Sequence, residues 1–369
     1  MTGLRRICFT EYQTNVGFLW FRSFHQAPPW CMVNNAFFYY NTHMIKQQNI
    51  LSGIRASGRL HIGNYLGALK QFVELRDDST KNCFFFIADL HALTTPFTPK
   101  ELKQNTLEVA AEYLAAGIDP NKSTFFVQSQ VLEHSTLAWI FNCLTPLGEL
   151  KRMTEFKDKS AKNETNINAG LLCYPTLMAS DILLYKPHFV PVGEDQTQHL
   201  ELTRGLARKF NKKFGQTFPE PKNYSLKPLR IMSLTDPTKK MSKTGDEALM
   251  LDDDPKEVHR KLKKAVTASE SGKKSPGEEN LMLLLAHFGQ KEEIAYFADQ
   301  QSSGNLKYSE LKEALAKNIS EYFAEFREKK KALLAEPAKL AKILREGAEK
   351  AGKVASATLL EVKEKIGLL

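Results

Sequence analysis

Apolar residues between positions 50 and 210 fall into two patterns that alternate along the chain. Short continuous runs, which predict strands buried on both faces, occupy residues 50–54, 83–88 and 124–129, with a further strand expected within 183–195. Stretches with apolar side chains at helical spacing separate these runs, at residues 64–75, 99–117 and 196–210. Strand–helix alternation of this kind predicts an α/β fold with a doubly wound parallel sheet.

The pattern changes after about residue 248, where the runs that are typical of strands stop. Helical spacing then continues with short breaks through residues 255–266, 280–288, 307–334 and 337–367. Near-continuous helix of this length predicts an all-α domain. We therefore expect three regions, namely an N-terminal extension over residues 1–48, an α/β domain over 49–247 and a helical domain over 248–369.

Residues 1–43 differ from the rest of the chain. They contain several arginines but a single acidic residue, Glu11, and they show no clear periodicity. One interpretation is a targeting presequence, because such segments carry arginine and little acid. The other is an upstream extension outside the folded unit with Met44 as the natural start, because MIKQQNILSG opens a well-formed strand and loop.

Composition narrows the classes of protein that the chain can represent. Its 369 residues are 42% hydrophobic and 25% charged, which is ample for one large core and a smaller second domain. No run approaches about 18 consecutive apolar residues, so we expect no membrane span. The 5 cysteines lack metal-ligand spacing, so no protein-bound metal is expected. The net charge of +9 tolerates a polyanionic partner, although acidic and basic residues are interspersed.

A glycine-rich loop, SGIRASGRLHIGN, follows the first expected strand at residues 52–64 and opens the next helix. Helix N-termini favour anions, and the first strand–helix loop of such a sheet is where nucleotides bind. His61 and Asn64, at the loop–helix junction, are therefore candidates to face a phosphate. The alternative is a glycine-rich turn with a surface histidine. The loop is not a P-loop, because the GxxxxGK[ST] pattern is absent.

A basic run, KKMSKTG, occupies residues 239–245. Taken alone, it is typical of a solvated surface loop. Its lysines and hydroxyl groups are also suited to phosphate oxygens, because each lysine brings a compact positive charge. It is therefore either a surface loop or the second half of a phosphate site whose first half is the loop at 52–64.

The two motifs together resemble the paired signatures of class I aminoacyl-tRNA synthetases. HIGN at residues 61–64 looks like the first signature, and KMSKT at 240–244 looks like the second. From about residue 49 to the C-terminus, longer segments are similar to bacterial and organellar tryptophanyl-tRNA synthetases, including AGLLCYPTLMASDILLY, VPVGEDQTQHLELTRGLARKFN and RIMSLTDPTKKMSK. The chain departs from the usual pattern at Arg55 and Ala56, where many members have Gln-Pro, and at Thr244, where serine is usual.

This resemblance implies a Rossmann-like catalytic domain and a reaction in two steps. Tryptophan attacks the α-phosphate of ATP to give tryptophanyl-adenylate and pyrophosphate, and the tryptophanyl group then passes to tRNA(Trp). The catalytic residues that it implies are Lys240, Lys243, His61, Asn64 and Lys159. The ATP-binding residues that it implies are Arg55, Ala56, Ser57, Gly63, Asn64, Gly193, Glu194, Asp195, Ile231, Lys240, Met241, Ser242, Lys243 and Thr244. Mg²⁺ is implied on the triphosphate.

Two of these residues have simpler explanations that stay open. Lys159, in FKDKS, is also explained as a solvated lysine at a helix end. Asp195, which follows an expected strand, is a candidate to accept both ribose hydroxyls, and it is also explained as the N-cap of the next helix.

Residues 174–185, YPTLMASDILLY, indicate which amino acid is selected. With Pro175 in the first turn of a helix, Met178 and Asp181 lie on one face. An indole N–H only donates and a carboxylate only accepts, so Asp181 would favour tryptophan over phenylalanine. A salt bridge or cap is the alternative for this aspartate. The residues predicted to bind tryptophan are Asp181, Met178, Tyr174, His91 and Gln196.

The resemblance also implies partners and a location. The helical domain is expected to read the anticodon of tRNA(Trp), and the apolar segment 137–148 is expected to contribute to a homodimer. We expect a bacterial cytoplasmic protein, or a protein of the mitochondrial matrix if residues 1–43 are a transit peptide. Three other functions stay open: a tyrosyl-tRNA synthetase, a nucleotidyltransferase for a small cofactor, and a non-catalytic RNA-binding paralogue.

Overall fold

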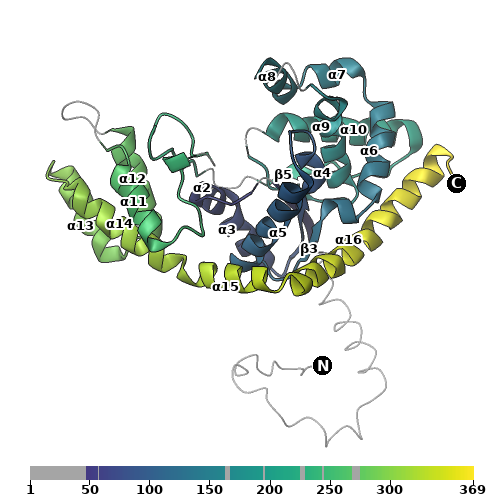
Figure 1. The fold of residues 1–369 in the computed structure, drawn as a ribbon. Coiled ribbons are helices and arrows are strands. Elements are labelled where there is room, and N and C mark those ends of the chain that lie inside the picture. The colour runs from purple at the N-terminus through teal and green to yellow at the C-terminus, as the bar shows by residue number, and fades with distance from the viewer. Residues whose placement is uncertain are drawn as a thin grey trace, which may run out of the picture. The chain divides into compact units, whose positions relative to one another are not determined.

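A computed structural model gives the fold of the chain (Figure 1). It describes residues 47–56, 58–162, 167–193, 196–224, 229–242, 245–267 and 275–369, apart from the side chains of 159–162 and 245. The chain divides into two compact units, residues 1–46 and 47–369, and the described residues all belong to the second unit. The predictions for residues 1–43 and for Met44 lie outside the described residues. Within the described ranges, no helix is long and apolar enough to cross a membrane.

Parallel strands form a 5-stranded sheet in the order β3-β2-β1-β4-β5. The strands are β1 (Gln48–Arg55), β2 (Lys81–Ala88), β3 (Thr124–Val127), β4 (Phe189–Val190) and β5 (Lys222–Asn223). Ile50 of β1 pairs with Cys83 of β2 on one side and with Phe189 of β4 on the other. The strand order therefore reverses at β1, and ligands of such sheets bind beyond the carboxyl ends of the strands at the reversal. The predicted doubly wound parallel sheet is confirmed.

Helices pack against both faces of the sheet (Figure 1). They include α3 (Lys70–Asp77), α5 (Pro99–Ala115), α6 (Glu133–Leu144), α9 (Ala169–Leu183) and α10 (Thr197–Phe214). Successive strand residues point to opposite faces. Phe85 of β2 therefore packs in one core with Phe72 of α3, whereas its neighbour Phe86 packs in the other with Phe141 of α6 and Ile182 of α9. The continuous apolar run at 83–88 is explained by burial on both faces.

Local capping residues determine where these helices begin. α5 begins at Pro99, as predicted, because Thr98 and Glu101 form a capping box there. α9 corrects a prediction, since Pro175 lies inside this helix and not in its first turn. The side chain of Asn168 accepts the N–H of Leu171 and starts the helix at Ala169, and the buried proline is accommodated by packing.

Shorter elements connect these parts. They are α2 (Ile62–Asn64), the π-helical turn η1 (Tyr65–Leu69), α4 (Asp89–Ala92), η2 (Gln128–Gln130), α7 (Leu147–Lys151), α8 (Thr154–Lys162) and η5 (Gly245–Glu247). The stretch predicted as one helix at 64–75 is therefore divided between η1 and α3, with α2 before them.

From Pro255 onward the described chain is helical, as predicted. The helices are α11 (Pro255–Lys264), α12 (Pro276–Phe288), α13 (Lys291–Ser302), α14 (Tyr308–Tyr322), α15 (Ala324–Ala335) and α16 (Pro337–Ile366). The last of them returns to the sheet, because a Cβ at Gly347 of α16 would lie 1.7 Å from the carbonyl oxygen of Phe125 in β3. Only glycine permits this approach. α16 thus packs directly against β3. The domain boundary expected at residue 248 stays a prediction.

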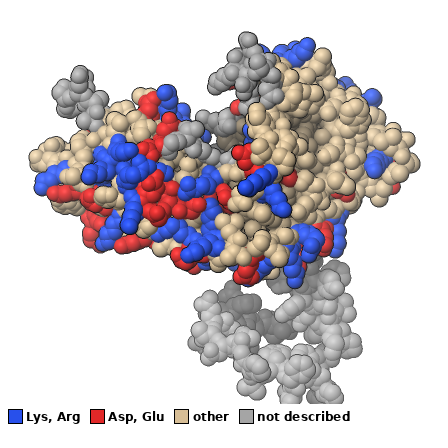
Figure 2. Space-filling view, in the orientation of Figure 1, with Lys and Arg blue, Asp and Glu red and all other residues tan. Residues whose placement is uncertain are grey.

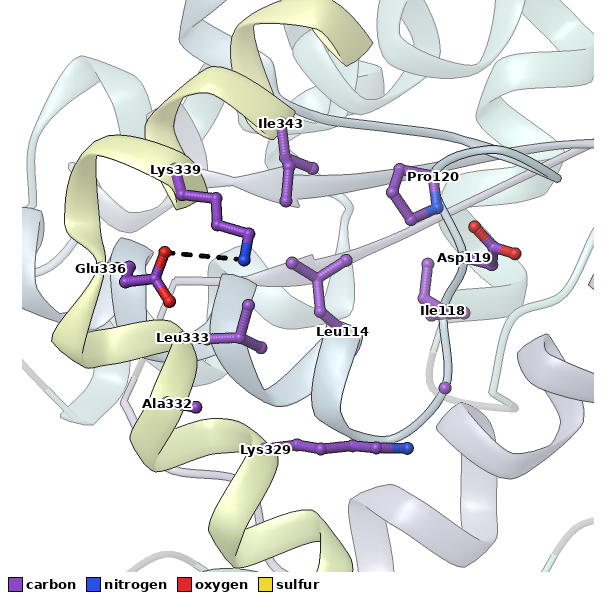
Figure 3. A pocket seen from close by; sticks show the side chains of 11 residues that line it. Leu114, Ile118, Asp119, Pro120, Lys329, Ala332, Leu333, Glu336, Lys339 and Ile343 are labelled. Carbon is purple, nitrogen blue, oxygen red and sulfur yellow. Dashed lines mark ion pairs between the residues drawn. The ribbon is translucent and has the colours of Figure 1, made fainter.

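A hollow of about 430 Å³ lies where α15 and α16 pass the end of α5 (Figure 3). Leu114, Leu333 and Ile343 give it apolar walls, and Lys339 pairs with Glu336 at 3.5 Å. None of the residues predicted to bind substrates lines this hollow.

Candidate active site

A cavity of about 790 Å³ opens beyond the carboxyl ends of β1 and β4. The predicted site residues that line it are Arg55, Gly63, Asn64, His91, Tyr174, Met178, Asp181, Gly193, Gln196 and Lys240. These residues come from segments far apart in the sequence. The structure therefore brings residues predicted for ATP and residues predicted for tryptophan to one cavity, at the reversal of the sheet.

The remaining predicted residues fall into three groups. Those that are buried without lining the cavity are Ala56, His61, Ile231 and Met241, and Ser242 is exposed. Those outside the described residues are Ser57, Glu194, Asp195, Lys243, Thr244 and the side chain of Lys159. The helix after β4, α10, has Gln196 as its N-cap residue. Both explanations of Asp195 stay predictions, because this residue lies outside the described ones.

The HIGN motif is a tight corner at the start of α2. His61 is the N-cap residue, and Oδ1 of Asn64 accepts its N–H at 3.2 Å. The His61 side chain is buried, and a Cβ at Gly63 would lie 2.9 Å from its ring. Glycine at 63 is therefore required by the position of the imidazole. The expectation of a helix start directly after the glycine-rich loop is confirmed.

The described part of the KMSKT motif is an extended segment. The N–H of Met241 donates to the carbonyl oxygen of Ile231 at 3.0 Å, and the Met241 side chain is buried. Alternate residues of an extended segment point in opposite directions, which lets Lys240 line the cavity while Met241 anchors in the core. Ser242 donates from Oγ to Oε2 of Glu247 at 2.5 Å. The described part of the motif, residues 240–242, is therefore anchored at the cavity wall by Met241.

Asp181 lies at the centre of a buried hydrogen-bond network. Its Oδ2 is 2.8 Å from Nε2 of His91 on α4, and its Oδ1 is 2.6 Å from Nδ1 of His134 on α6. Oδ1 also accepts from Nε2 of Gln128 at 2.7 Å. Nε2 of His134 is in turn 2.8 Å from the hydroxyl of Tyr185. Three elements, α4, η2 and α6, thus hold this carboxylate in one orientation.

The network keeps Asp181 ionised. Burial alone would raise its pKa, but the hydrogen bonds from His134 and His91 outweigh burial and hold the pKa at about 2. An ionised carboxylate accepts about four hydrogen bonds in favourable geometry. Oδ2 has one of these donors, so it retains capacity for another donor in the cavity that Asp181 lines.

Two further polar side chains shape the wall. Nη2 of Arg55 donates to the hydroxyls of Thr94 at 3.2 Å and Thr95 at 3.0 Å, which fixes the guanidinium at the end of β1. The hydroxyl of Tyr174 is 2.6 Å from Nε2 of the buried His199. Burial raises the pKa of Tyr174, so the phenol stays neutral and can donate or accept. The cavity thus offers a fixed cation and a fixed hydroxyl next to the Asp181 network.

Sequence reasoning missed several residues at this site. Glu155 and Arg230 line the cavity, while Gln128, His134 and His199 hold residues that line it. Gln128 could have been found, because it lies near the carboxyl end of the strand predicted at 124–129, and such ends meet the cavity edge. His134 carries no such signal, since it lies in a helix and meets Asp181 only through the packing of α6 on α9.

Comparisons with known proteins agree with this arrangement. Residues 45–335 match the family model described as tRNA synthetases class I (W and Y). The tryptophan–tRNA ligase of Caldanaerobacter subterraneus subsp. tengcongensis is 50% identical over 333 residues, covering 87% of this chain and 99% of the relative. That of Clostridium tetani is 44% identical, covering 88% and 96%. The crystal structure of tryptophanyl-tRNA synthetase from Campylobacter jejuni with ADP and tryptophan has a TM-score of 0.78 and 38% identity, covering 86% of this chain and 99% of that one.

Fold, motifs and comparisons define the class of protein. The chain belongs to the class I aminoacyl-tRNA synthetases of the tryptophan and tyrosine group. Within that group it belongs with the tryptophan–tRNA ligases, as its similarity over nearly their whole length shows.

Proposed function

We propose that this chain activates L-tryptophan with ATP to tryptophanyl-adenylate and pyrophosphate, and then transfers the tryptophanyl group to tRNA(Trp). One observation carries this proposal. A buried, ionised acceptor, Asp181, shares one cavity with Lys240 and Asn64, which belong to the two phosphate motifs. The cavity therefore offers an indole acceptor and phosphate contacts to reactants that must meet. The relatives with these motifs are tryptophan–tRNA ligases.

For the first step, the protein has to position the reactants and stabilise charge on the phosphates. Lys240 supplies a positive charge at the cavity wall. The stabilisation that this charge provides increases as negative charge moves onto the leaving pyrophosphate. Arg55 and Asn64 line the same cavity, which supports a role for them in contacting the carboxylate and phosphate groups. The resemblance to class I synthetases adds Lys159 and Lys243 as further catalytic residues, and Thr244 as an ATP-binding residue, to this proposal.

The amino-acid end selects tryptophan by hydrogen-bond chemistry. The indole N–H donates to Asp181, and a phenylalanine ring offers no donor in that place. Met178 lies on the same helix and packs along the ring, as its polarisable thioether permits. Tyr174 and Gln196 line the same cavity and hold the α-amino group.

Mg²⁺ is proposed to enter with the triphosphate. Within the described ranges, no group of three or more His, Cys, Asp and Glu side chains could hold a metal ion. Mg²⁺ in nucleotide sites is commonly held by phosphate oxygens and water, so such a site fits the residues present. When bound, it would neutralise charge on the β- and γ-phosphates.

The helical region is proposed to recognise tRNA(Trp). Over α11–α14, Lys and Arg side chains alternate with Asp and Glu side chains (Figure 2). A mixed surface of this kind favours placed contacts to unpaired bases over a general attraction to phosphate.

A homodimer is proposed on the face that carries α6. Leu132, Trp139 and Leu147 are exposed there, with Trp139 exposed by 69%. The surface drawn over α6, α9 and α10 is largely uncharged (Figure 2). A second copy would cover these apolar side chains. Light scattering should give twice the mass of one chain, and a single-chain mass at micromolar concentration would contradict the dimer.

For the compartment, we keep the bacterial cytoplasm as the proposal. The mitochondrial matrix is the alternative if residues 1–43 are a transit peptide. Sequencing the N-terminus of the native protein tests the two: a chain that begins at Met44 itself indicates initiation there, whereas a chain that begins at another residue after position 1 indicates removal of a transit peptide.

ATP–pyrophosphate exchange tests the activation step directly. The purified chain should exchange labelled pyrophosphate into ATP with tryptophan, and tyrosine should support less than about a hundredth of that rate. A preference for tyrosine would overturn the proposed substrate. No exchange with any amino acid would favour the non-catalytic paralogue.

A further inference from the structure

A cluster of charged side chains that the proposed chemistry does not use lies next to the HIGN motif. Its members alternate in sign and come from different elements: Arg59, Glu112, Asp252, Asp253, Lys261 and Lys330. Glu112 on α5 is fully buried, and Lys330 on α15 is 4% exposed. Buried charges are costly unless they are paired, so the contacts inside the cluster determine its role.

Lys330 makes two of these contacts. Its Nζ lies 2.7 Å from Oε1 of Glu112 and 2.6 Å from Oδ2 of Asp252. The other oxygen of Glu112, Oε2, accepts the N–H of Leu60 at 3.0 Å. Leu60 directly precedes His61 in the chain. One ammonium group on α15 therefore reaches the backbone at the start of the HIGN motif through a single carboxylate.

Through Asp252, the same ammonium group of Lys330 also contacts the segment that follows the KMSKT motif. Oδ1 of Asp252 accepts from Nε of Arg59 at 2.7 Å. Beside it, the N–H of Leu251 donates to the carbonyl oxygen of Leu60 at 3.0 Å, and His61 and Met250 form an antiparallel bridge. The chain after KMSKT thus runs against the chain before HIGN, and the ion pairs hold the two together.

Asp253 links the cluster to α11 through Lys261. Oδ1 of Asp253 accepts from Nη2 of Arg59 at 2.9 Å, and Oδ2 accepts from Nζ of Lys261 at 2.6 Å. Oδ2 of the same aspartate also accepts the N–H of Met250 at 2.9 Å. Both helices of the C-terminal region that reach the cluster, α11 and α15, therefore fix the same two backbone segments.

We propose that Lys330 is a positioning residue for the phosphate half of the active site: by joining Glu112 to Asp252, it sets where His61 and the segment after KMSKT lie against each other. This inference rests on the proposed function, because it assigns Lys330 a part in ATP use. Lys330 does not line the cavity, so it acts through Glu112 and Asp252. The Asp181 network lies in the other core and shares no residue with this cluster.

The contact between Glu112 and Lys330 depends on pH through the protonation of Glu112. Burial alone would lower the pKa of Lys330, but Glu112 and Asp252 outweigh burial and raise it. Burial raises the pKa of Glu112 to about 7, against the attraction of Lys330. The pKa of Asp252 is lowered instead, because its hydrogen bonds to Arg59 and Lys330 outweigh burial. As pH falls, Glu112 therefore takes up a proton before Asp252, and its contact to Lys330 weakens.

The first test compares two lysines on α15. Lys330→Met should lower kcat/KM for ATP in pyrophosphate exchange by roughly 10- to 100-fold, because small displacements at a reacting centre cost that much. KM for tryptophan should stay within about threefold, and Lys330→Arg should recover most of the loss. The matched control is Lys329→Met, whose side chain points to the hollow of Figure 3 and is 52% exposed, and it should behave as the unsubstituted chain. All rates are normalised to the active fraction by titration of adenylate formation.

A second variant covers the case in which Lys330→Met does not fold. Glu112→Gln imitates the protonated carboxyl group and keeps an acceptor for Leu60. The ratio of kcat/KM for ATP between the unsubstituted chain and this variant should fall from about tenfold at pH 8 towards one at pH 6. Groups that both proteins share cancel in this ratio.

Three results would overturn the inference: unchanged ATP kinetics in Lys330→Met, equal losses for ATP and tryptophan, or a Glu112→Gln ratio that does not change with pH. Failure of the proposed function is a different result, because the unsubstituted chain would then show no exchange at all.

Discussion

Replacing Asp181 with alanine tests the amino-acid end of the site. The change removes the acceptor proposed for the indole N–H, and a hydrogen bond to a charged group is worth about 1.5–3 kcal/mol. Tryptophan should therefore bind roughly 10- to 150-fold more weakly. The same change leaves His91, His134 and Gln128 without their shared acceptor, which destabilises the fold and confounds a simple comparison of affinities.

A substrate analogue separates the two effects. In 3-benzothienylalanine, sulfur replaces the indole N–H while the ring keeps its shape. The unsubstituted protein should prefer tryptophan over this analogue by roughly 10- to 150-fold, and Asp181→Ala should reduce the preference to within about twofold. Isothermal titration with each compound measures the four affinities of the cycle.

A matched control comes from the same helix. Met178→Leu changes the packing against the ring but keeps the acceptor, so both affinities should change while their ratio stays constant. The reasoning is refuted if Asp181→Ala retains the full preference for tryptophan over the analogue, because the acceptor would then lie elsewhere.

Three other predictions follow from the same geometry. Lys240→Ala should lower the exchange rate at saturating tryptophan by about 100-fold and keep KM for tryptophan within about threefold. The control is Lys239→Ala, because the Lys239 side chain is 77% exposed, and it should change neither quantity. A collapse of tryptophan affinity in Lys240→Ala would contradict the role. Gly63→Ala should displace the His61 ring and reduce exchange by roughly 10- to 100-fold. The control is Gly205→Ala, which should be neutral because a Cβ there meets no atom within 4 Å. Equal activities of the two variants would show that the ring position is unimportant. The folded pKa of Asp181, about 2, lies below its unfolded value, so its contribution of roughly 2–3 kcal/mol is fully present above about pH 4 and is lost as pH falls towards 2. Urea unfolding should accordingly show a steeper acid loss than in Asp181→Asn, and parallel profiles would contradict the assignment.

The sequence allowed the central part of the sheet to be predicted because β2 and β3 are largely buried, whereas the two exposed residues of β5 carry no such pattern and were not predicted. Cys83–Ala88 is almost entirely apolar and contacts two cores, so local pattern and tertiary environment agree. The two phosphate motifs were also predictable, since each carries its chemistry in a few adjacent residues. Their placement at one cavity follows from the rule that ligands bind at the reversal of strand order.

Other features depend on contacts that no local pattern records. Pro175 was placed at a helix start by its usual preference, but the cap at Asn168 and the packing of α9 decided otherwise. His134 and Lys330 become important only because α6 meets α9 and α15 meets α5. Gly347 resembles any small residue of an amphipathic helix until α16 is found against the backbone of β3.

Aminoacylation is the measurement that tests the central claim most directly. Purified chain, ATP, Mg²⁺ and labelled tryptophan should convert a tRNA(Trp) transcript to tryptophanyl-tRNA, and the same transcript should accept no tyrosine. A transcript of tRNA(Tyr) should stay uncharged with either amino acid. Charging of tRNA(Tyr) with tyrosine, or failure to charge tRNA(Trp) by protein that forms tryptophanyl-adenylate, would contradict the account.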